Sequence, residues 1–325
     1  MVSPFENTLF KIPPFMDSHI HFMSDGKPLR IEEGPSLART FLSRGIVEVN
    51  DMGHKQGQGE NFKKTLAEGE AELFLNIRTA GQAVYKKGTY GGFLGRGVSG
   101  KNEIKIVIKE LARQRVDYLK VINSGIVSLR EHEPVTPGGF SREEWKIIAE
   151  EAGCHGLRIR CHANGDPAIQ QALSFGVSTI EHGFFISEDT LDQMAEKGVS
   201  WTPTAQALMT LKSFCSANEH AFIEKIVDNH LKAVYDGISK GIVLKIGTDS
   251  GSKGVRTGES FFKELQLFKS AGLSWEQLLA AATLGWQELK KGNYLLVRKD
   301  FIEREKIEAF YFGGRKMDLG PAPSC

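Results

Sequence analysis

Phe15-Met-Asp-Ser-His-Ile-His21 begins as a short apolar run and ends in two histidines. Side chains two positions apart on a β-strand point to the same face, so His19 and His21 can hold one metal ion together. A lone His-x-His pair is weak evidence, because such pairs occur by chance on many strands. Its meaning depends on the motifs found elsewhere in the chain.

Apolar runs of the same kind recur along the chain, and amphipathic stretches typical of helices separate them. We predict strands at residues 15–20, 45–49, 73–77, 118–122, 157–161, 178–180, 199–201 and 242–246. We predict helices at residues 35–43, 61–69, 103–115, 141–152, 167–175, 187–196, 217–239, 260–271 and 275–283. Ser141-Arg-Glu-Glu144 is a capping box, which marks where one of these helices begins.

Eight strands that alternate with helices favour an α/β fold with a parallel sheet and right-handed crossovers. Eight such units close into a (β/α)8 TIM barrel, which we expect to span residues 1–285. An open, doubly wound sheet is the alternative, and periodicity alone does not separate the two. Residues 293–299 and 306–312 predict two short strands in a small C-terminal β appendage, residues 286–325.

Composition narrows the function classes. The 325 residues contain 41 Lys and Arg against 40 Asp and Glu, a balance that gives no support for a nucleic-acid or membrane partner. No apolar run reaches the roughly 18 residues of a transmembrane helix. The four cysteines, Cys154, Cys161, Cys215 and Cys325, form no CxxC pair. We therefore expect reduced thiols in a cytoplasmic protein.

Metal-ligating residues end several of the predicted strands. His162 ends the fifth, His182 the sixth and Asp249 the eighth, while Lys120 lies in the fourth. The carboxyl ends of barrel strands meet at one mouth, where active sites of this fold lie. Imidazole and carboxylate ligands suit catalytic zinc or related divalent ions. Each residue has a plainer alternative role, such as a core histidine or a loop cap, but five such coincidences at strand ends do not account for the set.

These motifs resemble the amidohydrolase superfamily, and within it the imidazolonepropionase-like and prolidase-like metal-dependent hydrolases. The resemblance covers residues 13–283 and includes five motifs in the same order. They are Phe15-Met-Asp-Ser-His-Ile-His21, Asp117-Tyr-Leu-Lys120 with Ser124-Gly125, His162-Ala-Asn-Gly165, Ile180-Glu-His-Gly183 and Gly247-Thr-Asp-Ser-Gly251. Families of this kind carry a β-sandwich beside the barrel, so the C-terminal strands are expected to be its remnant.

The resemblance implies a centre with two divalent metal ions. His19, His21 and Asp249 would bind the first ion, His162 and His182 the second, and a carboxylated Lys120 would bridge both. We expect zinc, with manganese or iron as the alternatives. The implied reaction is hydrolysis of an amide bond, in a dipeptide, N-acyl amino acid or cyclic amide, by a metal-bridged hydroxide. Asp249 would be the catalytic residue that acts as general base and then as general acid.

Two enzymatic alternatives stay open: a mononuclear deaminase-type hydrolase, and hydrolysis of phosphate or lactone esters by the same metals. The substrate is a small molecule, and its selection should fall to His54 and to residues 82–98 and 130–139. We expect the glycine-rich residues 91–97 to form a flexible active-site loop. Arg78, Arg96, Arg130 and His132 are candidates to meet a substrate carboxylate. Members of the superfamily are often oligomeric, so a homo-oligomer is a further open outcome.

Overall fold

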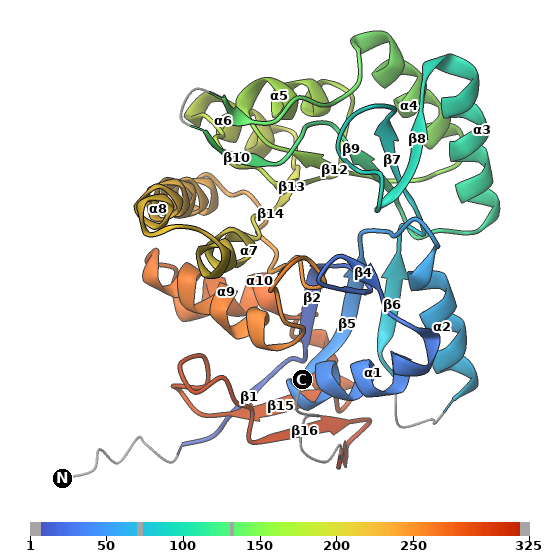
Figure 1. Cartoon of the computed structure of the whole chain (residues 1–325). Helices are drawn as coiled ribbons and strands as arrows, with labels where there is room; N and C mark the ends of the chain where they lie inside the picture. The colour runs from blue at the N-terminus through green and yellow to red at the C-terminus, as the bar shows by residue number, and fades with distance from the viewer. Residues whose placement is uncertain (1–7, 70–73, 131–132, 319–325) are drawn as a thin grey trace.

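The computed structural model describes residues 8–69, 74–130 and 133–318. Parallel strands lie inside and helices cover them on the outside (Figure 1), which confirms the α/β class. The parallel strands are β2 (Phe15–Ile20), β5 (Ile46–Asp51), β6 (Asn76–Thr79), β7 (Ala83–Lys86), β8 (Gly95–Val98), β9 (Leu119–Ile122), β12 (Ile159–Ala163), β13 (Thr179–His182) and β14 (Ser200–Thr202).

Helices follow most of these strands, as an α/β arrangement requires. The helices are α1 (Gly34–Ser43), α2 (Gln58–Glu68), α3 (Gly100–Arg113), α4 (Arg142–Cys154), α5 (Asp166–Ser174), α6 (Glu188–Glu196), α7 (Ala205–Thr210), α8 (Ala217–Ser239), α9 (Glu259–Ser270), α10 (Trp275–Ala282) and α11 (Gln287–Lys290), with short 3-10 helices η1 (Ile31–Glu33) and η2 (Leu211–Phe214). No described helix is long and apolar enough to cross a lipid bilayer.

Local capping signals fix where helices begin. The hydroxyl of Ser141 accepts a hydrogen bond from the amide of Glu144 at 3.3 Å, and the Glu144 carboxylate accepts one from the amide of Ser141 at 3.0 Å. Ser274 and Gln277 form the same reciprocal box at the start of α10. Because these side chains satisfy amides that have no partner within the helix, the helix starts predicted from them are confirmed.

The strands do not form one closed hydrogen-bonded ring. They form a six-stranded sheet in the order β14-β13-β12-β9-β7-β8 and a three-stranded sheet in the order β2-β5-β6. The break lies between β6 and β9, because β7, in a segment that we expected to be a loop, pairs with β9 and occupies the edge that β6 would otherwise meet. The prediction of a loop at residues 82–98 is therefore wrong: it holds two paired strands, β7 and β8.

On the opposite side, residues 242–250 join the two sheets without forming a regular strand. The amide of Trp201 in β14 donates to the carbonyl of Val243 at 3.0 Å, and the amide of Ser18 in β2 donates to the carbonyl of Ile246 at 2.8 Å. Only isolated bridges link this segment to its neighbours. The eighth predicted strand thus lies where a barrel strand would lie, but it makes single contacts instead of a continuous ladder.

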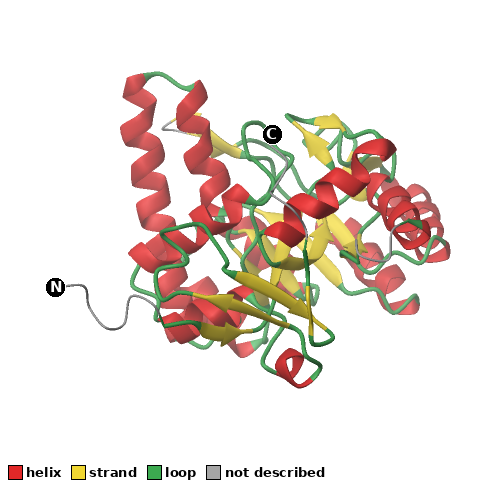
Figure 2. Cartoon of the chain, turned by 90° about the horizontal axis from the view of Figure 1, so that it is seen from below, coloured by secondary structure: helices red, strands yellow, loops and turns green. Residues whose placement is uncertain are grey.

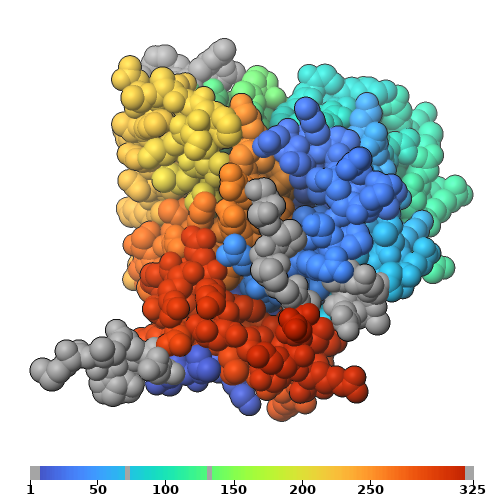
Figure 3. Space-filling model, turned by 60° about the horizontal axis from the view of Figure 1, so that its bottom comes forward, coloured from blue at the N-terminus to red at the C-terminus, as the bar shows by residue number. Residues whose placement is uncertain are grey.

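A second, antiparallel sheet covers one end of the molecule. Its order is β1 (Phe10–Ile12), β15 (Tyr294–Val297), β16 (Ala309–Phe312) and β17 (Arg315–Lys316). Figure 2 shows this sheet in front of the parallel strands, and Figure 3 shows the C-terminal residues gathered over the same face. The two C-terminal strands were predicted; the pairing of β1 with β15 was not. The boundary at residue 285 stays a prediction.

Short hairpins lie around the other end, where the functional residues gather. They are β3 (Met23–Ser24) with β4 (Lys27–Pro28), and β10 (Val127–Arg130) with β11 (Glu133–Val135). The hydrophobic core runs between the strands and the surrounding helices, and includes fully buried Trp145 and Trp201. Cys161 lies in this core, and Cys154 and Cys215 are also free thiols; Cys325 lies outside the described residues.

Candidate metal centre

One cavity of about 350 Å³ opens at the carboxyl ends of the parallel strands. Strands β2, β9, β12 and β13 each bring one or two polar side chains to it from within the strand or just after it, as expected for side chains at the mouth of such a fold. All six residues predicted from the sequence line this cavity: His19, His21, Lys120, His162, His182 and Asp249. Residues separated by up to 230 positions in the chain are thereby brought into one pocket.

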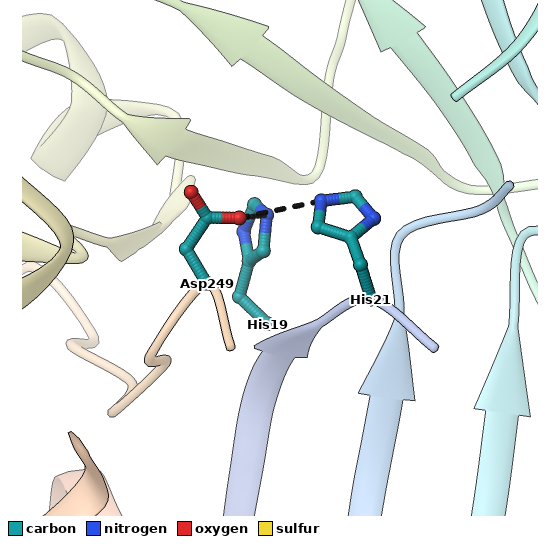
Figure 4. Close-up of side chains that lie close together, drawn as sticks. All are labelled: His19, His21 and Asp249. Atoms are coloured by element: carbon teal, nitrogen blue, oxygen red, sulfur yellow. Dashed lines mark ion pairs between the residues drawn. The ribbon is translucent and has the colours of Figure 1, made fainter. Parts of the chain in front are cut away.

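His19, His21 and Asp249 form the tightest group. Nε2 of His19 lies 3.4 Å and Nε2 of His21 3.3 Å from Oδ1 of Asp249. The possible ligand atoms of the three residues all lie within 4.8 Å of one another. Figure 4 shows both imidazoles turned toward the Asp249 carboxylate. Two imidazoles and a carboxylate at this spacing can hold one divalent ion.

Hydrogen bonds on the far side of each ring orient these two imidazoles. Nδ1 of His19 lies 2.7 Å from Oε2 of Glu181, and Nδ1 of His21 donates to the carbonyl of Gly53 at 3.0 Å. A proton on Nδ1 leaves the Nε2 lone pair directed into the pocket. Metal-binding histidines are oriented in this way, by a carboxylate or carbonyl behind the ring.

His162 and His182 lie next to this group. Their ring centroids are 4.5 Å apart, and the His182 ring is 4.8 Å from that of His19. Nε2 of His162 donates to the carbonyl of Gly125 at 3.0 Å, and Nδ1 of His182 lies 2.7 Å from Oγ1 of Thr204. Each ring therefore keeps its second nitrogen free for another partner.

The electrostatics of the pocket favour neutral imidazoles at His162 and His182. Burial, and then the nearby Lys120, lowers the pKa of His162 to about 3. Burial, and then the neighbouring His162, holds the pKa of His182 well below its ordinary value. Burial raises the pKa of Asp249, but the imidazoles of His19 and His21 outweigh it and hold this pKa well below the usual range. A neutral histidine and an ionised carboxylate are the forms that bind metals.

Lys120 lies at the bottom of the pocket with no partner for its amine. Its side chain is 1% exposed, and Nζ makes no hydrogen bond. Burial lowers the pKa of Lys120 to about 8, although Glu181 raises it. An unpaired buried ammonium is unfavourable, so the amine is easily deprotonated. Nε2 of His19 is also buried without hydrogen-bond geometry to any partner; both orphaned atoms fit a site that binds cations.

Glu181 and Arg160 support the pocket from beneath, and neither was predicted from the sequence. Oε1 of Glu181 accepts from Nε of Arg160 at 2.7 Å, while Arg160 also donates to the carbonyl of Ser18 at 2.7 Å. Arg160 stands two residues before His162, on the same face of β12. Glu181, on β13, pairs in register with His162 of β12. Alternation along β12 was a signal for Arg160, whereas Glu181 could be found only once the pairing of the two strands was known.

Three residues of the pocket have left-handed backbone. The φ angles are +67° at His182, +57° at Asp249 and +54° at Thr204. Residues other than glycine rarely occupy this region, and such conformations cluster at functional sites. Two of the six predicted residues thus sit at strand ends where the chain turns sharply into the pocket.

The predicted substrate-contacting residues have mixed outcomes. Arg78 pairs with Glu48 and Arg96 with Glu110, and neither arginine lines the pocket. Nδ1 of His54 accepts from the amide of Gln56 at 3.1 Å, so that side chain is held within its own loop. The side chain of Arg130 and the whole of His132 lie outside the described residues. Tyr90, Phe93 and Leu94, between β7 and β8, do line the pocket.

The chain is similar to several known proteins. The ochratoxinase of Aspergillus niger is 25% identical over 285 residues, which cover 75% of this chain and 58% of the ochratoxinase. The crystal structure of that enzyme has a TM-score of 0.73 at 22% identity and covers 96% of this chain and 83% of that one. A Xaa-Pro dipeptidase with bound methionine has a TM-score of 0.76 at 19% identity, with 94% and 86% covered.

The chain spans less than two thirds of the length of the curated ochratoxinase that it matches. The sequence profile of the Amidohydrolase family matches residues 10–285. That range runs from β1 past α10 and contains all six residues of the pocket. The chain belongs to the amidohydrolase family.

Proposed function

We propose that this protein hydrolyses amide bonds of small molecules with two divalent metal ions, zinc in the first place. His19, His21 and Asp249 would hold one ion, His162 and His182 would hold the other, and Lys120, once carboxylated, would supply a further anionic ligand to them. The proposal takes the two sheets and residues 242–250 together as one (β/α)8 barrel. The observation that carries it is the convergence of all six side chains on one pocket of a chain in this family.

The residues fit the two ions. Lys120 Nζ and His19 Nε2 are buried without hydrogen-bond partners; a metal ion would coordinate the His19 nitrogen, and carboxylation would turn the Lys120 amine into an anionic group. A neutral lysine amine reacts with carbon dioxide to give an anionic carbamate, and the lowered pKa of Lys120 favours the neutral amine. The carbamate would supply negative charge for two cations in a pocket with a single ligand carboxylate.

The chain's own groups bind and move protons. Two divalent ions here would acidify a bound water and polarise a scissile carbonyl. Asp249, ionised and next to both His19 and His21, is the base that takes the proton from the attacking water and then gives it to the leaving nitrogen. The hydrogen bond that Nδ1 of His19 donates to Glu181 keeps the His19 ring in position during this transfer.

The relatives support the amide class. Ochratoxinase and a Xaa-Pro dipeptidase are among the proteins that this chain resembles, and N-acyl amino acids and dipeptides are the substrates we propose here. We also propose that the protein is cytoplasmic and that its partner is a small-molecule substrate, with no nucleic-acid or membrane partner. A homo-oligomer remains open.

Metal content tests the proposal. Protein purified without chelator and with bicarbonate should contain close to two divalent ions per chain by elemental analysis. Lys120→Ala should bind about one ion or fewer, because it removes the bridge. Lys197→Ala, at an exposed position on the C-terminal side of α6, is the matched control and should keep both ions.

Other results would contradict parts of the proposal. About one ion per chain, unaffected by Lys120→Ala, would replace the binuclear centre with a mononuclear one. The absence of bound metal even after reconstitution with zinc, manganese or iron would overturn the mechanism as a whole.

A further inference from the structure

Beyond the six polar residues, the wall of the pocket is largely apolar. Leucine, valine, isoleucine and phenylalanine side chains come from four separate segments of the chain. They include Phe93, Leu94, Ile126, Leu208, Leu211 and Val255. A pocket lined in this way favours a ligand with apolar groups and a few polar anchors.

The rim of the pocket is also apolar, although it is open to water. Phe93 is 41% and Ile126 45% exposed, and Phe214 of η2, next to the pocket residue Lys253, is 50% exposed. Large apolar side chains that gather at one opening mark a binding site more often than single exposed ones do. The rim extends the apolar wall outward, so it fits a substrate with bulky apolar parts.

Lys253 supplies a cation at this wall. It lines the pocket, and its Nζ lies 4.3 Å from the centroid of the Phe214 ring. No ion pair joins it to a carboxylate within the described parts of the chain. Lys120 is the other lysine of the pocket, and the proposed carbamate would make it anionic. Lys253 is therefore the group that can pair with an anion on the substrate.

The position of Lys253 in the chain indicates which anionic group of a substrate it can pair with. The loop that carries it starts at Asp249: the amide of Ser252 donates to the carbonyl of Asp249 at 3.2 Å, and that of Val255 to the carbonyl of Ser252 at 3.0 Å. Asp25 accepts from the amide of Gly254 at 2.9 Å and fixes the loop further. The same short turn thus presents the proton donor for the leaving nitrogen and a cation four residues later.

We propose that Lys253 determines specificity by pairing with the free α-carboxylate of an N-acyl amino acid, and that the apolar wall and rim select amino acids with large apolar side chains. In such a molecule the carboxylate is two bonds from the amide nitrogen, so an ammonium on the Asp249 turn is placed to meet it. The apolar side chain and the acyl group contact the apolar wall and rim. This inference rests on the proposed amide hydrolysis and adds to it the residue that selects the substrate.

A matched pair of amides tests the inference. N-benzoyl-L-phenylalanine and N-benzoyl-2-phenylethylamine differ only in the carboxylate. Zinc-reconstituted wild-type protein should hydrolyse the acid with a kcat/KM at least tenfold higher. Lys253→Met should lower kcat/KM for the acid about 10- to 100-fold, mostly through KM, because a hydrogen bond to a charged group is lost. The ratio of kcat/KM between the acid and the neutral amide should therefore fall toward one in Lys253→Met.

Two controls separate the possible causes. Lys299→Met changes an exposed lysine outside the pocket and should behave as wild type with both amides. Metal content by elemental analysis should be equal in wild type and Lys253→Met, since Lys253 is no ligand. A loss of metal in Lys253→Met would overturn its assignment as a carboxylate-binding residue.

The inference and the proposed function can fail separately. Equal kcat/KM for the two amides, or an unchanged preference in Lys253→Met, would overturn the inference and leave amide hydrolysis intact. Hydrolysis of neither amide, nor of a panel of dipeptides, N-acyl amino acids and cyclic amides, by protein that contains two metal ions would overturn the proposed function itself.

Discussion

The carboxylate of Glu181 joins two groups that would otherwise be buried alone. It lies 2.7 Å from Nδ1 of His19 and 2.7 Å from Nε of Arg160, and it is fully buried. Burial raises its pKa, but Arg160, Lys120 and His19 outweigh burial and hold it well below the ordinary value. Glu181 is therefore an anion that orients a metal-binding ring and neutralises a buried guanidinium.

Glu181→Gln should weaken both functions. We expect metal affinity to fall about 10- to 100-fold, as for other residues that orient a metal-binding histidine. We also expect the free energy of unfolding to fall by about 3–5 kcal/mol, because Arg160 keeps its charge without a buried partner. Competition with a chromophoric chelator measures the first change, and urea denaturation of metal-free protein measures the second.

Glu303→Gln is the control for this prediction, since it breaks an exposed pair with Lys269. Exposed pairs contribute about 0–1 kcal/mol, so the control should change neither metal affinity nor stability appreciably. Unchanged metal affinity in Glu181→Gln would show that the hydrogen bond to His19 has no part in metal binding.

Single residues differed in how well the sequence revealed them. His19, His21, Lys120, His162, His182 and Asp249 stood out because their residue types bind metals and they end predicted strands, and the structure brings all six together. Glu181 and Arg160 did not, because a charged residue inside a strand has no meaning until the neighbouring strand is known. Arg78 and Arg96 are charged and near the right strand ends, yet they pair with other carboxylates.

The short helix α7 is held in place by a buried residue of another helix. Glu264 of α9 accepts from the amides of Ala205 at 2.9 Å and Gln206 at 2.6 Å. These amides begin α7, directly after Thr204, whose hydroxyl contacts His182. Burial raises the pKa of Glu264 to about 8, although the two amides lower it. Glu264 thus links the position of α7 to the proposed metal centre.

The free energy of unfolding should depend on pH through Glu264. Its pKa rises from an ordinary 4.5 to about 8 on folding, so the folded chain keeps a proton that the unfolded chain has lost. This contribution is fully present below about pH 4.5 and is lost as the pH rises through 8. The slope should reach up to about 1.4 kcal/mol per pH unit. Urea denaturation of metal-free protein between pH 5 and 8 measures it.

Glu264→Gln should remove this contribution and lower stability near pH 5 by about 1–3 kcal/mol, because its NH2 group faces an amide donor. Asp17 and Asp51, with pKa values raised by burial to about 7 and about 6, add slopes of the same sign as Glu264. His162, His182 and His230, with pKa values lowered by burial, add slopes of the opposite sign below about pH 6.5. The quantity to compare is therefore the difference in slope between wild type and Glu264→Gln. The exposed Glu196→Gln is the control and should retain the full slope. A Glu264→Gln slope equal to that of wild type would contradict the assignment.

Elements were predicted as well as their local signals allow. Seven of the eight predicted strands are present, since short apolar runs between caps and glycines are typical of buried strands. The eighth makes only isolated bridges, because an apolar run does not show how many hydrogen bonds the segment will form with its neighbouring strands. Strands β7 and β8 were missed because Gly91, Gly92, Gly95 and Gly97 give this segment the composition of a loop. At Gly95 even a Cβ would collide with the backbone of Ala83, so that pairing requires glycine.

The first and last described strands of the molecule belong to one sheet. Ile12 of β1 is opposite Leu295 of β15, and Leu295 is fully buried against Gly45, which precedes β5. The antiparallel sheet is thus part of the same core as the parallel strands. A chain connected in this way should unfold as a single unit.

We expect one cooperative thermal transition for the whole molecule. Leu295→Ala should lower the free energy of unfolding by about 2–5 kcal/mol. The midpoint temperature should fall equally when it is measured by the fluorescence of the buried Trp145 and Trp201 and by hydrogen exchange in the antiparallel sheet. Leu296→Ala, at the adjacent half-buried position, is the control and should cost less. Two separate transitions would instead show that residues 286–325 fold as an independent domain.

The left-handed backbone at His182 and Asp249 also limits how this pocket could be redesigned. Asparagine, aspartate and histidine are the residues other than glycine that occupy this region most readily, whereas a β-branched residue there would be a strained outlier. His182 and Asp249 therefore have few replacements that keep both the turn and a side chain able to bind a metal ion. A redesign of the pocket should begin at lining positions whose backbone accepts any residue.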